Sequence, residues 1–114
     1  MQYLLLINSE ESHYATMTEE AMGQLMADYD KFSTDLQESG ALLGGNRLQP
    51  SPTATTVRVR NGETMTTDGP FTETKEQFGG YYLIDVPNLD DAIAWAARVP
   101  TAKYGSVEVR PVWE

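Results

Sequence analysis

The sequence predicts an α+β domain in which two helices cover one face of an antiparallel sheet. Two stretches carry apolar residues at steps of three and four, the spacing of a helix that is buried along one side. Short apolar or alternating runs lie before, between and after them, as expected for strands. The pair Asn61-Gly62 between two such runs is typical of a tight β-hairpin. The length of 114 residues fits a single domain over residues 1–114.

The first part of the chain predicts a strand followed by a long helix. Residues 3–7 form a short apolar run, the pattern of a central strand covered on both faces. Residues 18–38 have the most regular helical spacing, with Thr18 as the expected N-cap and acidic residues in the positive first turn. Thr16 offers a competing capping box, and Gly40 suits the left-handed position that ends a helix.

Strands dominate the middle of the chain. Residues 41–49 predict a strand in which Gly44-Gly45 marks a bulge or a close backbone approach. Residues 57–60 and 63–67 predict the two arms of the hairpin. A further strand is expected to begin directly after Gly79-Gly80, where aromatic and branched residues are dense.

The C-terminal part predicts a second helix and a last strand. Asn88 is the expected N-cap of a helix over 89–98, and Val107 and Val109 alternate with charged residues in the strand. The resulting order is a βαββαβ plan with an inserted hairpin, which is the plan of ferredoxin-like domains. The two helices leave one sheet face uncovered, so we expect a homodimer whose apolar interface involves Trp113 or Trp95.

Charge and composition exclude several classes of function. The chain has 17 acidic and 8 basic residues, and its formal charge of −9 disfavours nucleic acid and anionic membrane surfaces. Its apolar runs are far shorter than the ~20 residues of a membrane helix, so we expect a soluble cytoplasmic protein. With no cysteine and a single histidine, we expect no disulfide, no metal site and cofactor-free chemistry.

Residues 67–80 fit neither a helix nor a strand pattern. An acid, a Gly-Pro turn, a threonine-rich charged stretch and a glycine pair follow one another between two predicted strands. A loop of this kind is typical of the wall of a pocket. We therefore expect it to contribute to a binding site for an unknown small molecule.

Several separated blocks of the sequence form one recognisable pattern. They are Asp68-Gly69-Pro70-Phe71, the runs 73–77 and 79–82 and the tail 104–111, together with 48–50 and 89–98. In this order the blocks resemble the YCII-related family that carries the DGPF motif. The resemblance covers nearly the whole chain and implies a dimeric α–β barrel with a small pocket between helix, sheet and motif loop. YCII relatives look like enzymes because they pair a histidine near the first helix with an aspartate. Tyr29 stands at the position matched to that histidine, which puts such a dyad in doubt here.

The two candidate catalytic residues each have two interpretations. Asp68 is either a general base or a turn residue whose side chain accepts backbone N–H bonds around Gly69-Pro70. A desolvated base would have a raised pKa, whereas a turn-capping acid would have a lowered one. Tyr29 is either a core side chain or a hydrogen-bond donor in the pocket.

The other candidates would bind the ligand. Tyr81 and Tyr82 point to opposite faces of their strand, so only one of them can share the space beside Gly80. The alternative to ligand binding, for the charged loop residues and for Arg47, is a position on a solvated surface. His13 is expected in an exposed loop outside the site. The candidate ligand-binding residues are Thr72, Glu73, Lys75, Gly80, Tyr81 and Arg47.

Two functions fit these residues. One is a cofactor-free enzyme of the lyase or isomerase type, in which Asp68 moves a proton while Tyr29 or Tyr81 positions a developing oxyanion. The other is a non-catalytic ligand-binding or protein-interaction module linked to transcription or stress regulation, since members of the family resemble partners of alternative sigma factors.

Overall fold

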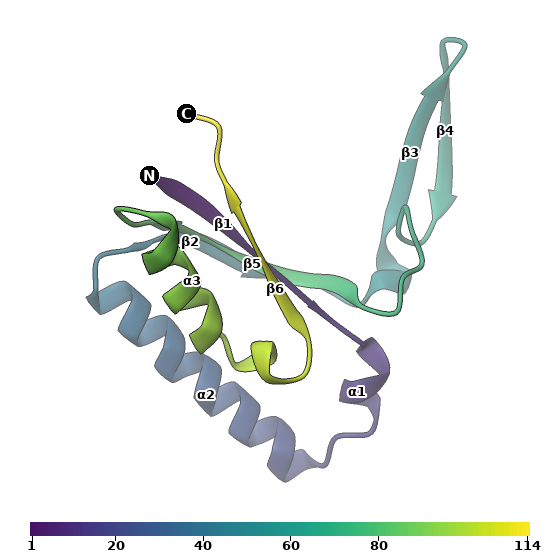
Figure 1. Ribbon diagram of the computed structural model, residues 1–114. Helices are drawn as coiled ribbons and strands as arrows, with labels where there is room; N and C mark the ends of the chain where they lie inside the picture. The colour runs from purple at the N-terminus through teal and green to yellow at the C-terminus, as the bar shows by residue number, and fades with distance from the viewer.

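The computed structural model describes all 114 residues as a four-stranded antiparallel sheet with helices on one face and a projecting hairpin (Figure 1). The elements in chain order are β1 (Gln2–Ser9), α1 (Glu11–Ala15), α2 (Glu19–Glu38), β2 (Leu42–Arg47), the short 3₁₀ helix η1 (Ser51–Thr53), β3 (Thr55–Arg60), β4 (Glu63–Asp68), β5 (Gln77–Asp85), α3 (Leu89–Arg98), the 3₁₀ helix η2 (Pro100–Lys103) and β6 (Ser106–Pro111).

The main sheet has the strand order β2-β5-β1-β6, and each neighbouring pair is antiparallel. Helices α2 and α3 lie side by side on one of its faces, as the sequence predicts (Figure 1). This α+β arrangement is compatible with the ferredoxin-like plan. None of the helices is both long and apolar enough to cross a membrane.

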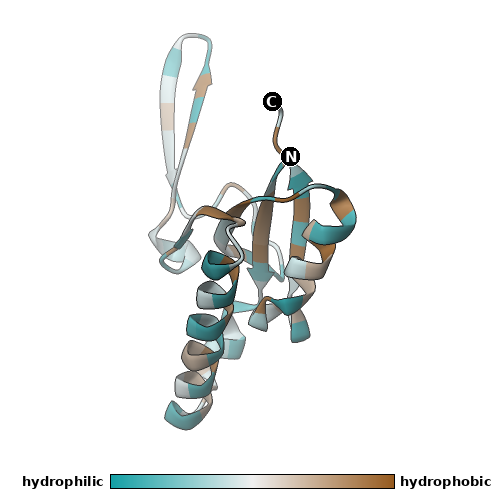
Figure 2. Ribbon diagram, turned by 90° about the vertical axis from the view of Figure 1, so that its left-hand side faces the viewer, coloured by the Kyte–Doolittle hydropathy of each residue, from teal (hydrophilic) through white to brown (hydrophobic).

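Strand β1 shows why the sheet has two unlike faces. Its residues alternate between buried and partly buried along the whole strand. Tyr3, Leu5 and Ile7 join the core beneath the helices, whereas Leu4 and Leu6 point to the face without helices and are only partly buried. The expectation that the strand over residues 3–7 is covered on both faces is therefore wrong for a single chain. Figure 2 shows the apolar residues concentrated along the strands of this sheet.

The expected helix ends are confirmed. The side chain of Thr18 accepts a hydrogen bond from the backbone N–H of Ala21 at 3.1 Å, and Asn88 accepts one from Asp91 at 2.9 Å. Gly40 has a φ of +81°, the left-handed conformation that ends α2. The hydroxyl of Thr16 instead donates to the carbonyl of His13 at 3.1 Å, so it closes α1 rather than opening α2.

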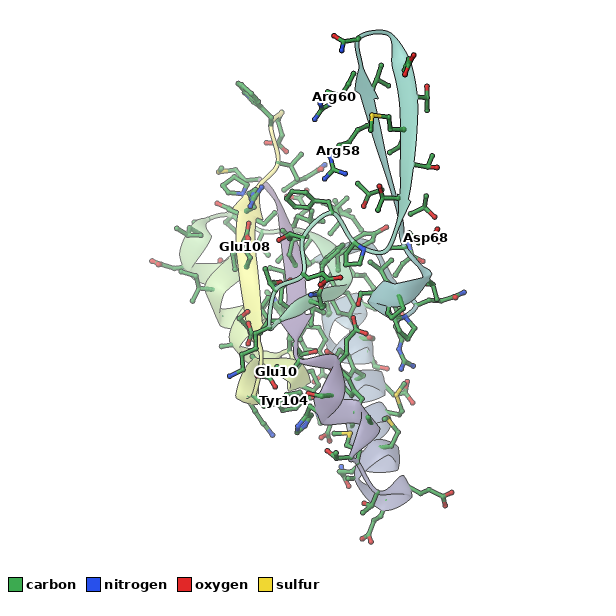
Figure 3. The ribbon with its side chains drawn as sticks, turned by 90° about the vertical axis from the view of Figure 1, so that its right-hand side faces the viewer. Glu10, Arg58, Arg60, Asp68, Tyr104 and Glu108 are labelled. Carbon is green, nitrogen blue, oxygen red and sulfur yellow. The ribbon has the colours of Figure 1, made fainter.

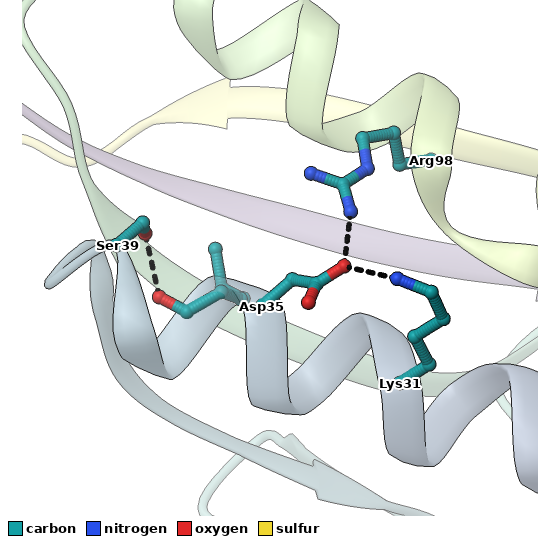
Figure 4. A network of polar contacts seen from close by, with 5 residues as sticks. Lys31, Asp35, Ser39 and Arg98 are labelled. Carbon is teal, nitrogen blue, oxygen red and sulfur yellow. Dashed lines mark hydrogen bonds and ion pairs between the residues drawn. The ribbon is translucent and has the colours of Figure 1, made fainter.

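A polar cluster ties α2 to α3 (Figure 4). One carboxylate oxygen of Asp35 lies 3.0 Å from Lys31 Nζ and 2.5 Å from an Arg98 guanidinium nitrogen. The hydrogen bond from Lys31, with a smaller contribution from Arg98, lowers the pKa of Asp35. The same guanidinium lies 4.7 Å from the ring centroid of Trp95. Trp95 thus packs on the helix side of the sheet, away from the open face, whereas Trp113 is fully exposed.

The hairpin of β3 and β4 is confirmed and projects away from the body (Figure 1). Asn61 and Gly62 both have positive φ, 54° and 77°, as a type I′ turn requires. The hairpin rises on the side of the sheet opposite the helices (Figure 1). Val57, Val59 and Met65 on its two faces are 58%, 59% and 51% exposed.

Two local expectations are wrong. His13 does not lie in a loop, because it belongs to helix α1. Strand β5 begins at Gln77, so Gly79-Gly80 lies inside the strand rather than before it. The cause is pairing with the end of β1, where Ser9 faces Gln77 and Asn8 faces Phe78; the register shifts between Ile7 and Asn8 at the glycine pair.

Candidate functional site

A cavity of about 890 Å³ lies between α2 and the neighbouring strands β2 and β5. Helix α1 and the buried residue Thr101 close one part of its wall. Strands β2 and β5 provide its floor because they pair directly at this edge of the sheet. The side chains from α2 that line it are Leu25, Met26, Tyr29 and Ser33.

Glycines keep the floor of the cavity free of side chains. Gly80 pairs directly with Ile7, whose side chain lies on the helix side, so a β-carbon at Gly80 would point to the cavity face. That β-carbon would lie 3.2 Å from the carbonyl oxygen of Asn46. At Gly45 it would lie only 2.7 Å from the carbonyl oxygen of Tyr81, which no side chain tolerates. One glycine of each pair, Gly45 or Gly80, is therefore explained by close approach of backbone to backbone, whereas a β-carbon at Gly44 or Gly79 would meet open space.

The two adjacent tyrosines of β5 point to different faces. Tyr82 pairs with Leu5 and lies on the helix side, where its hydroxyl is 2.9 Å from Ser33 and its ring is edge-on to Phe32. Tyr81 also borders the cavity, but its hydroxyl accepts a hydrogen bond from the Asn46 amide at 2.9 Å on the other face. The side chain that shares the space above Gly80 is therefore that of Tyr82.

Hydroxyl groups line the end of the cavity beside α1. The hydroxyl of Tyr29 lies 2.5 Å from that of Thr101, and the hydroxyl of Tyr14 lies 2.9 Å from that of Ser9. Burial raises the pKa of the Tyr29 phenol, and the hydrogen bond with Thr101 offsets part of that rise. Tyr29 is thus both a packed side chain and a polar wall residue of the cavity, so its two interpretations hold together.

The motif loop forms a second, separate hollow of about 430 Å³. Asp68 and Glu73 line it, and Gln77 borders both hollows. The turn is held through the main chain of Gly69, which has a φ of +100°: its N–H donates to Ala54 at 2.7 Å, and its carbonyl accepts the Thr56 hydroxyl at 2.9 Å. The carboxylate of Asp68 is exposed at the base of the hairpin (Figure 3).

The rest of the loop is tied down by its charged residues. Lys75 Nζ lies 3.1 Å from the carboxylate of Glu10, just before α1, and Glu76 accepts a hydrogen bond from Ser106 at 2.7 Å. Thr72 is exposed, and Phe71 is 77% exposed. Of the predicted site residues, Tyr29, Arg47, Gly80 and Tyr81 thus border the large cavity, Asp68 and Glu73 border the second hollow, and Thr72 and Lys75 border neither.

Comparison with known proteins identifies the family of this chain. A family model for the YCII-related domain matches residues 1–114. The chain belongs to the YCII-related family. An uncharacterized protein of Rhizobium meliloti (strain 1021) is 40% identical over an aligned length of 114, and the alignment covers 98% of this chain and 92% of that protein. The resemblance seen in the sequence is confirmed, and it extends over the whole chain.

The single histidine of this YCII-related protein lies just outside the hydroxyl-lined end. The His13 ring is 4.2 Å from the ring of Tyr104 and 5.9 Å from that of Tyr14, between ring centroids. Burial is the largest cause of the raised pKa of Tyr104, which reaches about 12. No group of three or more His, Cys, Asp and Glu side chains in the chain is arranged to hold a metal ion.

Sequence reasoning missed several wall residues of this YCII-related cavity. Ser9 continues the alternation of Tyr3, Leu5 and Ile7, so the strand period was a signal that could have placed it on the helix side. Thr101 has no comparable signal, because its position depends on how η2 folds back after α3. The missed residues are Ser9, Tyr14, Ser33, Tyr82 and Thr101.

Proposed function

We propose that this YCII-related protein binds a small molecule in the cavity between α2, β2 and β5. The observation that carries the proposal is a hollow of about 890 Å³ with a glycine floor and hydroxyl groups at one end. Ligand sites of proteins have volumes of roughly 300–1,000 Å³ and combine an apolar wall with a few placed polar groups. Leu25 and Met26 supply apolar wall, and Tyr29 and Arg47 supply polar groups.

The test is a thermal-shift screen of the purified protein against small metabolites, with two alanine variants in parallel. A ligand present at one hundred times its dissociation constant stabilises the folded state by about 2.7 kcal/mol. Gly80→Ala should weaken the shift because its methyl group enters the cavity face, whereas Gly23→Ala should keep it because that β-carbon meets open space on α2. A ligand that stabilises wild type and Gly80→Ala equally would place the site elsewhere.

If the protein also catalyses a reaction on this ligand, we propose that Asp68 transfers the proton. Because Gln77 borders both hollows, a ligand that extends past Gln77 from the cavity would come near the Asp68 carboxylate. Such a carboxylate can act as a general base without any cofactor. Asp68→Asn should then abolish turnover while the ligand still produces its thermal shift. Undiminished turnover in this variant would remove Asp68 from the reaction.

The projecting hairpin favours a second candidate, an interaction between two copies of the chain. An isolated two-stranded hairpin is only marginally stable in water, and this one exposes Val57, Val59 and Met65. It rises on the same side as the open sheet face, and Arg58 and Arg60 extend from it (Figure 3). The chain as a whole carries a charge of −9, so these arginines complement an acidic second copy. We propose a homodimer in which each hairpin packs on the partner beside the open sheet face.

Light scattering at micromolar concentration tests the dimer. Wild type should have twice the mass of one chain. Val57→Asp combined with Val59→Asp should shift it to monomer, since the two exposed valines would be replaced by charged side chains in the proposed interface. Ala27→Asp, which places the same charge on an exposed position of α2, should remain dimeric. A monomeric wild type would rule the dimer out.

A further inference from the structure

Four hydroxyl groups line the α1 end of the cavity: those of Ser9, Tyr14, Tyr29 and Thr101. We call them the hydroxyl cluster. They come from β1, α1, α2 and η2, so only the folded chain brings them together. Ser9 and Thr101 are the two buried polar residues of the whole protein, 5% and 1% exposed.

Burial of these hydroxyls is compensated by contacts within the cluster. A hydroxyl buried without a hydrogen-bond partner loses its hydration and destabilises the fold. Ser9 is paired with Tyr14 at 2.9 Å, and Thr101 is paired with Tyr29 at 2.5 Å. The four groups therefore form two hydrogen-bonded pairs along the cavity end.

The hydroxyl cluster carries no formal charge at neutral pH. Its only ionisable members are phenols, which as a class are protonated at neutral pH and act as hydrogen-bond donors. Burial raises the pKa of the Tyr29 phenol above its ordinary value. Glu11, the acidic residue of α1, also lines the cavity. Its two carboxylate oxygens accept the backbone N–H of Ser51 at 3.0 and 3.2 Å. A carboxylate of a ligand would lose its hydration here without meeting a cation within the cluster.

A count of donors shows what the cluster can still bind. Each of the four hydroxyls has one O–H to donate and two lone pairs that accept. The two contacts within the cluster use two of these donors. Two O–H groups are therefore left for a group outside the cluster, and several lone pairs remain to accept a hydroxyl proton.

We propose that the hydroxyl cluster binds an uncharged oxygen of the ligand, a carbonyl or a phenolic hydroxyl, while the apolar body of the ligand lies along α2 and the glycine floor. This inference rests on the proposed small-molecule function and names the ligand class. Selectivity follows from hydrogen bonding, because a carbonyl accepts a free O–H and a phenol also donates, whereas a carboxylate must give up its hydration shell.

Four small aromatic probes test the proposal: acetophenone, phenol, benzoate and toluene. Their affinities are measured by NMR titration, with Met26 as the reporter inside the cavity and Met65 on the hairpin as the control. Acetophenone and phenol should bind about fivefold more tightly than toluene, the effect of one net hydrogen bond, and benzoate should not exceed toluene. Tyr29→Phe and Thr101→Val should remove the advantage of acetophenone without changing the affinity for toluene.

The outcomes separate this inference from the function on which it rests. If all four probes bind at Met26 with equal affinity, or if benzoate binds most tightly there, the cavity is a ligand site but the proposed ligand class is wrong. If no probe, toluene included, perturbs Met26, both the cavity function and the inference fail. If Tyr29→Phe or Thr101→Val also weakens the binding of toluene, that substitution has damaged the cavity. The other of the two variants then tests the proposed ligand class.

Discussion

The hydroxyl of Tyr29 on α2 lies 2.5 Å from the hydroxyl of Thr101 in η2, a contact between residues 72 positions apart. It joins the long helix to the turn that precedes β6, and both side chains line the cavity. The same pair therefore contributes to the stability of the fold and to the chemistry of the cavity wall.

A double-mutant cycle measures this contact. Tyr29→Phe and Thr101→Val should each lower the free energy of unfolding by about 1 kcal/mol, because each leaves the other hydroxyl without its partner. The double variant should lose about 1 kcal/mol less than the sum of the two. Urea unfolding provides the values. The control is the pair Tyr29→Phe and Tyr81→Phe, whose effects should add because the two hydroxyls have different partners. If the effects of Tyr29→Phe and Thr101→Val also add, the contact between these residues contributes nothing to stability.

Alkaline pH should weaken the fold through Tyr29 and Tyr104. Both phenols have a raised pKa in the folded protein, to about 12 for Tyr104, while in the unfolded chain they ionise near 10. The stabilisation is thus fully present below pH 10 and is lost as the pH rises toward 12. Urea unfolding across this range should show a falling free energy of unfolding. The fall should be smaller in Tyr104→Phe, and an equal fall in that variant would contradict the assignment.

Gly105→Ala should destabilise the protein strongly. A β-carbon at Gly105 would overlap the carbonyl oxygen of Asn8 and lie 3.0 Å from the Ser9 side chain and 3.1 Å from the Thr101 methyl group. Overpacking of this kind costs about 3 kcal/mol. Gly23→Ala is the matched control and should raise the free energy of unfolding by about 1 kcal/mol, since alanine favours an exposed helix position. Equal stabilities of the two variants would mean that Gly105 is not closely packed.

Acid should loosen the link between α2 and α3. The hydrogen bond from Lys31, followed by that from Arg98, lowers the pKa of Asp35 below its ordinary value of 3.8. The contribution of Asp35 is therefore present above that value and disappears as the pH falls through the lowered pKa. Asp35→Asn should lower the urea midpoint at pH 7 and low salt, and less so at high salt. Asp30→Asn, at an exposed position of the same helix, should not change the midpoint; equal effects of the two would contradict a specific link.

The elements of the fold could be predicted because their signals are local. The helical stripe of α2, its Thr18 cap and the Asn61-Gly62 turn are each encoded within a few residues, and each is confirmed. Helix α1 was missed because five residues are too few to show a period. The start of β5 was misplaced because it depends on pairing with Ser9, which is far away in the sequence.

The site was harder to predict because it depends on contacts distant in the sequence. Turn chemistry identified the bend at Asp68, but nothing local says that this bend lies at the base of the hairpin, in a hollow separate from that of Tyr29. The choice between Tyr81 and Tyr82 depends on the register of β5 against β1, which places Tyr82 opposite Leu5. Thr101 was missed for the same reason, since its partner Tyr29 lies on another element.

The most direct test of the cavity as the binding site is NMR of the protein labelled at its five methionine methyl groups, recorded with a stabilising ligand from the thermal-shift screen. Met26 lines the cavity, whereas Met65 lies on the projecting hairpin. We predict that the Met26 signal shifts in proportion to occupancy while the Met65 signal stays in place. A ligand that moves Met65 and leaves Met26 unchanged would contradict the account.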